Sequence, residues 1–343
     1  MRLALFACLA ASFWTGSAQA GEWWAQHIDT PARVSAIETV TVDGKAQPRV
    51  NAGGLWYRPT RAGAAVKLTF VDMLAPPAKP DNALPDGHIV IGSRDVARAW
   101  LAEPTTRYDH GILGDKIEAG ALVIAGRDGK IHTLRLKTDA VFEDLEPRLA
   151  DLDGDGHDEI IVVKSYLKRG SALAVVALRK GRYEIVAETP PLGGSHRWLN
   201  PAGIADFNGD GKTDIALVRQ PHVVGELEVW AYADGYLRKA ATLPGTANHI
   251  IGARALHLSA VADFDGDGIM DIALPSLDRT HLRIVSFAPQ GPEGSKQPNP
   301  REIASIALPA KAVTNLALIP AQSGPPAIAA GLADGSLVVI RND

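Results

Sequence analysis

The chain contains very little cysteine: Cys8 is the only one among its 343 residues. It lies in a segment typical of a secretion signal, in which Leu3 to Trp14 is apolar and Ala18-Gln19-Ala20 has the small-x-small pattern of a cleavage site. We expect residues 1–20 to be a signal peptide, which leaves 21–343 as a mature chain without cysteine. A mature chain that cannot form disulfides in an oxidising compartment needs a large core or another source of stability.

Long hydrophobic runs and an excess of positive charge are also lacking. After the signal, no stretch reaches the roughly 20 apolar residues that a membrane-spanning helix needs, so we expect no transmembrane anchor in the mature chain. The formal net charge of -4 argues against a generally basic surface for nucleic acid. We therefore expect an exported protein, periplasmic or extracellular, that does not bind nucleic acid.

Common catalytic motifs are absent from the sequence. There is no Gly-x-Ser-x-Gly, Walker loop, His-Glu-x-x-His or Gly-x-Gly-x-x-Gly. Gly193-Gly194-Ser195-His196 places a serine beside a histidine, but it lacks the strand-turn-helix context of a nucleophile. We therefore assign no catalytic residue and interpret this stretch as a loop.

Three acidic segments, by contrast, are almost the same. They begin at Asp151, Asp206 and Asp263, which are 55 and 57 residues apart. Each has oxygen side chains at positions 1, 3, 5 and 9 and glycine at position 6, a density of oxygen ligands that suits a hard cation, above all calcium. The regular spacing indicates a repeated structural unit of about that length.

An EF-hand would share the beginning of this pattern but needs an acidic residue at position 12 and a helix after it. Position 12 is Val162, Leu217 or Leu274, each in a β-rich run. We therefore predict a compact loop closed by position 9, with the position-7 carbonyl as a further ligand. The predicted ligands are Asp151, Asp153, Asp155, His157 and Glu159; Asp206, Asn208, Asp210, Lys212 and Asp214; and Asp263, Asp265, Asp267, Ile269 and Asp271. The neutral Asn208 predicts weaker binding in the second loop.

The segments around the loops predict strands. A short apolar run precedes each loop, and three β-rich runs separated by turns follow it, which gives four strands per unit, as in a propeller blade. The clear units span about 147–191, 199–243 and 256–308. We expect an all-β fold, a single β-propeller of four-stranded blades over 21–343. Seven blades are preferred and six are possible, with roughly two blades in 43–103 and a closing strand from 22–42.

With these motifs the chain resembles the FG-GAP/VCBS-type repeat family, to which the integrin α-subunit propeller and many secreted bacterial proteins belong. The resemblance rests on Ala-Asp206-Phe-Asn208-Gly-Asp210-Gly-x-x-Asp214-Ile-Ala and its two sister segments. It implies a propeller outside the cytoplasm that is stabilised by about three structural calcium ions and is most often used for binding. Lyases and other enzymes also carry such repeats, so adhesion does not follow from the resemblance.

Loops that we expect to lead into the first strand of a blade have a different character. They contain arginine, histidine and aromatic residues, which could bind an anionic or sugar ligand near the propeller axis. The candidates are Arg107, Tyr108, His110, His196, Arg197, Trp198, His249 and Arg254. The alternative is that these side chains satisfy local backbone groups or fill the junctions between blades.

Three functions remain open from the sequence. The favoured one is an exported calcium-binding propeller that acts as a protein- or glycan-binding module. The second is a polysaccharide lyase or hydrolase that uses the same face, with Tyr108, His110, His196 and Arg197 as the only candidate groups. The third is a passive structural or assembly component.

Overall fold

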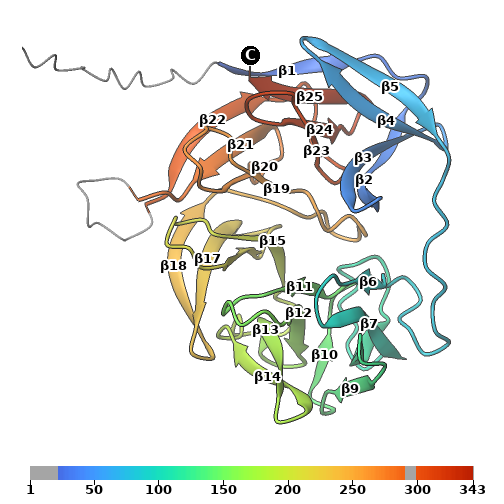
Figure 1. Ribbon diagram of the computed structural model, residues 1–343, viewed down its shortest axis with the longest axis vertical. Helices are drawn as coiled ribbons and strands as arrows, with labels where there is room; N and C mark the ends of the chain where they lie inside the picture. The colour runs from blue at the N-terminus through green and yellow to red at the C-terminus, as the bar shows by residue number, and fades with distance from the viewer. Residues whose placement is uncertain (1–21, 290–298, 343) are drawn as a thin grey trace, which may run out of the picture.

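The computed structural model describes residues 22–289 and 299–342, so the expected signal peptide at 1–20 lies outside the described residues. Within these ranges all regular structure is β, arranged in antiparallel sheets that stand around a common centre (Figure 1). No helix in the described ranges could span a membrane.

Six groups of four strands make up nearly all of the fold. The first two are β2 (Val34–Val42), β3 (Lys45–Ala52), β4 (Leu55–Ala62) and β5 (Ala65–Val71); and β6 (Val90–Ile91), β7 (Val96–Thr105), β8 (Glu118–Gly126) and β9 (Ile131–Arg135). The next two are β11 (Arg148–Ala150), β12 (Glu159–Tyr166), β13 (Gly170–Arg179) and β14 (Arg182–Glu188); and β15 (Leu199–Ala205), β16 (Asp214–Arg219), β17 (Glu226–Ala233) and β18 (Tyr236–Pro244). The last two are β19 (Ala260–Ala262), β20 (Asp271–Pro275), β21 (His281–Ser286) and β22 (Arg301–Ala307); and β23 (Ala317–Ile319), β24 (Ala327–Gly331) and β25 (Leu337–Asn342), completed by β1 (Trp23–Ile28).

The described part of the chain supplies six groups of four strands, the number that the sequence left as possible, and not the preferred seven. Residues 43–103 were expected to hold about two blades. They hold β3 to β5, then a segment without regular strands at 72–89, then β6 and most of β7. The prolines at 75–80 explain part of the difference, because proline cannot donate to a strand ladder. A further strand, β10 (Ala140–Phe142), joins the second and third groups into one nine-stranded sheet.

The N-terminal strand closes the last sheet, as expected. β1 pairs antiparallel with β25, from Trp23 opposite Asn342 to Ile28 opposite Leu337. This pairing gives β25 a neighbour on its outer side and joins the two ends of the described chain, so it removes an exposed sheet edge.

Neighbouring sheets pack face to face, and this explains the composition of the middle strands. β12, β16, β20 and β24 are apolar and buried almost throughout, because both of their faces meet another sheet. The outer strands β5 and β9 alternate between exposed and less exposed residues. Each hydrophobic cluster therefore lies within or between adjacent sheets.

One sector of the ring is open. Among the described residues, no hydrophobic cluster combines side chains of β2–β5 with side chains of β6–β9. Figure 1 shows the two groups apart, connected by the segment 72–89. Part of that segment covers β7, since the N–H of Leu84 donates to the carbonyl of Leu101 (2.9 Å).

We expect the closing strand β1 to stabilise the fold mainly through Trp23. Its ring is 8% exposed and packs edge-on against Phe264 of the neighbouring sheet (5.7 Å between centroids). Trp23→Ala should lower the free energy of unfolding by about 3–5 kcal/mol. The next residue, Trp24, is 40% exposed and is a matched control, whose substitution by alanine should cost about 1 kcal/mol or less. Urea unfolding measures both, and equal losses would contradict the closure argument.

Candidate functional site

The three acidic segments occupy the same place in three consecutive groups. They connect β11 to β12, β15 to β16 and β19 to β20, which are the first and second strands of their groups. Consecutive strands run antiparallel, so these loops all lie at one end of the ring. We call this end the acidic end.

Each loop is anchored by its second and ninth residues. The second residue is Leu152, Phe207 or Phe264, and all three side chains are buried. The ninth residue, which is Glu159 or Asp271 in the first and third loops, accepts the main-chain N–H of the second (2.9 and 2.8 Å). Burial, and then repulsion by neighbouring loop carboxylates, raises the pKa of these two carboxyls to about 7.

The first residue of each loop organises the turn. In the first loop, Asp151 accepts N–H groups from Gly154 (2.8 Å) and Gly156 (3.0 Å). Asp206 and Asp263 make the equivalent bonds in the other loops. Gly156 has φ of +88°, a left-handed conformation that a residue with a side chain rarely adopts. The loop backbone thus holds its carboxylates inward.

Two of the loops gather carboxylates closely enough to hold a metal ion. One oxygen from each of Asp151, Asp153 and Asp155 lies within 4.8 Å of the others, and Asp263, Asp265 and Asp267 form the same arrangement. Oδ1 of Asp271 is buried and has no hydrogen-bond partner among the described residues. Gathered carboxylates and an unpartnered buried oxygen fit a hard, oxygen-seeking cation.

The second loop differs at Asn208. The amide nitrogen of Asn208 donates to Oδ2 of Asp214 (2.8 Å), and its oxygen accepts the N–H of Asp210 (2.9 Å). A donor therefore stands where the other two loops have a second carboxylate oxygen. This loop offers a cation fewer oxygens and less negative charge.

The acidic loops also contact neighbouring groups. Arg94, between β6 and β7 of the preceding group, pairs with Asp158 in the first loop (3.0 Å). Arg301 of β22, which pairs with Asp265 (2.5 Å), belongs to the same group as the third loop. A Cβ at Gly209 in the second loop would lie 2.6 Å from the side chain of Ile269 in the third. Ordering one loop would therefore brace its neighbours.

The histidine and aromatic candidates lie at the opposite end, which we call the histidine end. His196 lies between β14 and β15 and His249 between β18 and β19, as expected for loops into a first strand. The segment 107–110 is different: it joins β7 to β8, the second and third strands of its group. In an antiparallel group this loop emerges at the same end, so the candidates still share a face.

Tyr108, His110 and His196 form one ring cluster. Tyr108 stacks on His196 (5.2 Å between centroids), and His110 lies 5.1 Å from His196. Nδ1 of His110 lies 2.6 Å from the buried carboxylate of Glu143, which also accepts the hydroxyl of Ser165. The Tyr108 hydroxyl accepts the N–H of His196 (2.8 Å), and burial raises the pKa of Tyr108 above its usual value.

A second cluster joins Trp198, His222 and His249. Nε2 of His249 lies 2.9 Å from the carbonyl of Ala253, so it carries a proton and donates. Nδ1 of His249 then accepts from Nε2 of His222 (3.0 Å). Trp198 is 2% exposed and donates its N–H to the carbonyl of Glu143 (3.1 Å), so its ring is taken up in packing. His222 was missed in the sequence, where it is a lone histidine in a turn.

The arginine candidates already have partners. Arg107 donates to the carbonyl of Ala140 and Arg197 to the carbonyl of Leu192. Arg254 pairs with Asp86 and Asp115, both at 3.1 Å. The described contacts therefore give these guanidinium groups structural roles.

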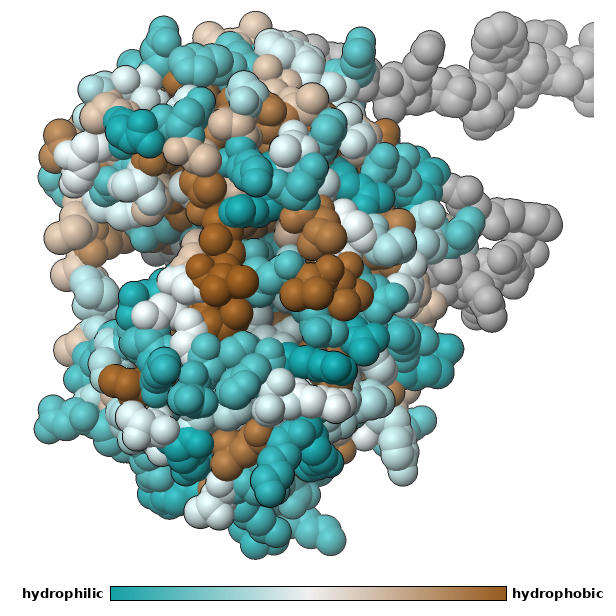
Figure 2. All heavy atoms as spheres, turned by 180° about the vertical axis from the view of Figure 1, so that it is seen from behind, coloured by the Kyte–Doolittle hydropathy of each residue, from teal (hydrophilic) through white to brown (hydrophobic). Residues whose placement is uncertain are grey.

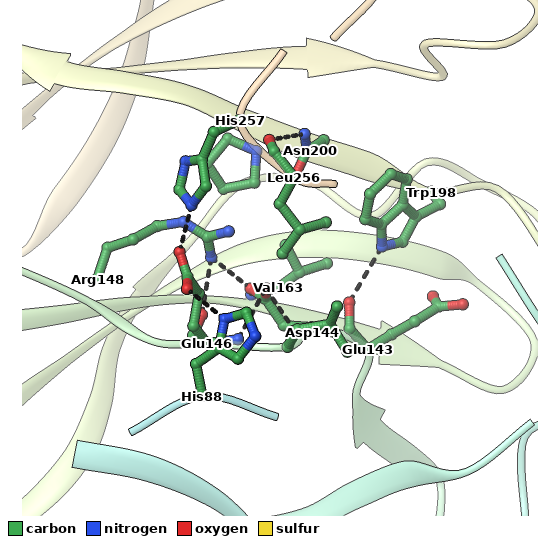
Figure 3. Close-up of polar contacts among 12 residues, drawn as sticks. His88, Glu143, Asp144, Glu146, Arg148, Val163, Trp198, Asn200, Leu256 and His257 are labelled. Carbon is green, nitrogen blue, oxygen red and sulfur yellow. Dashed lines mark hydrogen bonds and ion pairs between the residues drawn. The ribbon is translucent and has the colours of Figure 1, made fainter. Parts of the chain in front are cut away.

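A cavity with a volume of about 620 Å³ lies among the inner strands and their connections. Its polar wall holds an arrangement that sequence reasoning missed: Glu146 between His88 (3.0 Å) and His257 (2.6 Å), shown in Figure 3. Burial alone would raise the pKa of Glu146, but the bonds from both histidines hold it well below its usual range. These residues are far apart in sequence, and no motif connects them.

Residues around Glu146 hold its main chain in place. Arg148 donates to Asp144 (2.6 Å) and to the main-chain carbonyl of Glu146 (3.0 Å), as Figure 3 shows. Asp144 also accepts the N–H of Val163 on β12 (3.0 Å). The polar wall of the cavity is thus built on the third group of strands.

Comparison with known families gives one result. The model of the FG-GAP-like repeat matches residues 151–217 and 206–274. These two overlapping matches place FG-GAP-like repeats at residues 151–274 of the chain. The matched segments begin at the first and second acidic loops and reach through the third. A comparison with curated proteins found no match.

Burial makes the second histidine cluster sensitive to acid. It lowers the pKa of His249 to about 3 and that of His222 to about 4. In the unfolded chain these rings take up protons near pH 6.5, so the unfolded state binds more protons below that pH. The free energy of unfolding should fall between about pH 6.5 and pH 4, by up to ~1.4 kcal/mol per pH unit for each ring.

Urea unfolding of matched variants isolates this contribution from that of the carboxylates. The double substitution His222→Gln and His249→Gln should flatten the slope between pH 6.5 and pH 4. Substitution of the exposed His281 by glutamine should leave the slope unchanged. The same slope in both variants would contradict the assignment.

Proposed function

We propose that this protein is an exported, calcium-stabilised β-propeller that binds a protein or a glycan at its histidine end. The proposal rests on the different residues that the loops present at the two ends of the ring. The loops that gather carboxylates lie at the acidic end, and His88, Glu146 and His257, which form the polar wall of the cavity of about 620 Å³, come from connections at the other end. Export is supported by the signal-like residues 1–20 and by the FG-GAP-like repeats, which are typical of extracellular proteins.

Calcium is the cation that this ligand set favours. The loops offer only oxygen ligands, and calcium takes six to eight of them in flexible geometry. In this proposal Asp151, Asp153, Asp155 and Glu159 supply side-chain oxygens in the first loop, with the carbonyl of His157 as a further ligand. The third loop uses the equivalent residues. Bound calcium would remove the repulsion among the carboxylates and order loops that contact neighbouring sheets.

Binding is favoured over catalysis by the state of the candidate groups. A lyase needs a base and a free cationic group to neutralise the charge that develops on its substrate. The Tyr108 hydroxyl accepts a main-chain N–H, and Arg197 donates to a main-chain carbonyl. The side chain of His196 is 49% exposed, and although its Nε2 lies 3.2 Å from Asp109, the exposed part of its ring can contact a partner. A passive structural role would leave this end without a ligand.

Removal of calcium should destabilise the protein. In excess EGTA we expect the melting temperature to fall by about 5 °C or more, since a saturated site adds ~2.7 kcal/mol at a hundredfold excess over its dissociation constant. Asn208→Asp should strengthen the weakest site and raise the melting temperature in calcium. The exposed Asp29→Asn is a control that should change neither value. Unchanged melting in EGTA would exclude stabilising sites.

The binding role can be tested by affinity capture. The immobilised protein is exposed to extracellular and envelope fractions in calcium, and the eluted protein or glycan is then titrated against variants. His196→Asn, which tolerates the φ of +61° at this position, should weaken binding about tenfold. Lys212→Ala at the acidic end should leave it unchanged. A calcium-loaded column that retains nothing would contradict the proposed function.

A further inference from the structure

We propose that His110, His196 and His222 form a binding site for a divalent transition-metal ion, of which zinc is the test case, in a small pocket at the histidine end. All three side chains line one pocket of about 130 Å³. One water takes about 30 Å³ in the liquid, so the pocket can hold an ion together with a water. This site goes beyond the proposed function, because it requires neither calcium nor a partner molecule.

Hydrogen bonds determine which nitrogen of His222 carries the proton. Nε2 of His249 donates to the carbonyl of Ala253 (2.9 Å), so Nδ1 of His249 carries a lone pair. Nε2 of His222 donates to that lone pair (3.0 Å). The lowered pKa of His222 keeps its ring neutral at pH 7. Its Nδ1 is therefore an unprotonated nitrogen, the form of histidine that binds a metal.

The other two histidines are held in the same way by carboxylates. Nδ1 of His110 lies 2.6 Å from the buried carboxylate of Glu143, and Nε2 of His196 lies 3.2 Å from Asp109. A ring nitrogen that donates to a carboxylate leaves the opposite nitrogen to act as a ligand. Histidines that bind metals almost always donate their second ring nitrogen to a carboxylate, a carbonyl or a water, which fixes the tautomer and the orientation of the ring.

The rings of His110 and His196 have a spacing that suits a shared ion. Their centroids are 5.1 Å apart and their planes are inclined by 42°. Two imidazoles that bind one zinc ion at 2.0–2.1 Å with tetrahedral angles have centroids roughly 5 Å apart. The side chain of His196 is 49% exposed, so its ring can adjust to the position of the third ligand, His222.

The backbone at His196 is strained, which also supports a binding role. Its φ of +61° is a left-handed conformation that a residue with a side chain rarely adopts. The conformation is held by the Tyr108 hydroxyl, which accepts the N–H of His196 (2.8 Å), and by stacking of the two rings. Strain of this kind costs about 1–3 kcal/mol and tends to occur at functional sites.

Apolar residues surround the histidines. Ile112, Trp198 and Val223 line the same pocket. Figure 2 shows a similar contrast over one whole face of the molecule, where hydrophobic residues gather in a central band and hydrophilic residues cover most of the periphery. An apolar shell around a metal site limits the access of water to the ion and its ligands.

The ligand type distinguishes this site from the acidic loops. Imidazole nitrogen suits zinc, copper, iron and nickel, whereas calcium takes oxygen ligands. Three histidine ligands leave one position of a tetrahedral ion for water. The buried carboxylate of Glu143 would offset part of the positive charge of the ion. The two ends of the ring would then bind two different classes of metal.

The test uses the full chain, which is freed of metal with EDTA and then kept in excess calcium to occupy the acidic loops. Calorimetric titration with zinc should show one ion bound per chain. Cobalt(II), a spectroscopic substitute for zinc, absorbs strongly in the visible range in tetrahedral sites. Its addition should therefore produce intense bands, which zinc should then remove by displacement.

Matched variants assign the ligands. His222→Gln and His196→Asn should each weaken zinc binding at least about tenfold, since losing an outer partner of a ligand alone costs about 10–100-fold. Asparagine tolerates the left-handed backbone at position 196. His281→Gln removes an exposed histidine outside the pocket and should bind zinc normally.

X-ray absorption of the unsubstituted, zinc-loaded protein keeps the proposal testable if a variant does not fold, and it should show imidazole nitrogen around the ion. No zinc binding in excess calcium, a zinc ion coordinated by oxygen alone, or equal affinities in all three variants would overturn the proposal. Each of these results would leave the capture of a protein or glycan in calcium unaffected. Failure of the metal site is therefore distinguishable from failure of the proposed function.

Discussion

The pairing of β1 with β25 is the constraint on which the rest of the structure depends. It completes the sixth group of strands with residues from the other end of the described chain. The same strand carries Trp23 against Phe264, whose N–H binds the ninth residue of the third acidic loop, Asp271. Closure of the ring and order in a candidate metal loop are therefore coupled through one aromatic contact.

Antiparallel order then separates two kinds of loop. Connections between first and second strands emerge at the acidic end, and the connections on either side of them emerge at the histidine end. One end concentrates carboxylates in tight turns held by their own backbone. The other combines His88, Glu146 and His257 from three distant segments into the wall of a cavity. The carboxylate loops and the polar wall of the cavity therefore come from different connections of the same groups.

The open sector is an exception to the face-to-face packing of sheets in the rest of the ring. Where neighbouring sheets pack, their faces are buried and their middle strands are apolar on both sides. Between β2–β5 and β6–β9, the segment 72–89 provides the connection, and the ion pairs of Arg254 with Asp86 and Asp115 tie that segment to the loops at the centre.

The sequence by itself determined the repeat, the strand order around each acidic loop and the closing role of the N-terminus. These features depend on local spacing: an oxygen side chain at every second position of a turn, and apolar runs of strand length between turns. The sequence did not predict the number of groups. Residues 72–89 are long enough to form further strands, but their prolines favour a connection without strands. Tertiary structure alone decided that Trp198 and His249 are buried, that His222 joins them, and that Glu146 lies between two histidines. Those contacts join residues more than 20 positions apart, and only the ring brings them together.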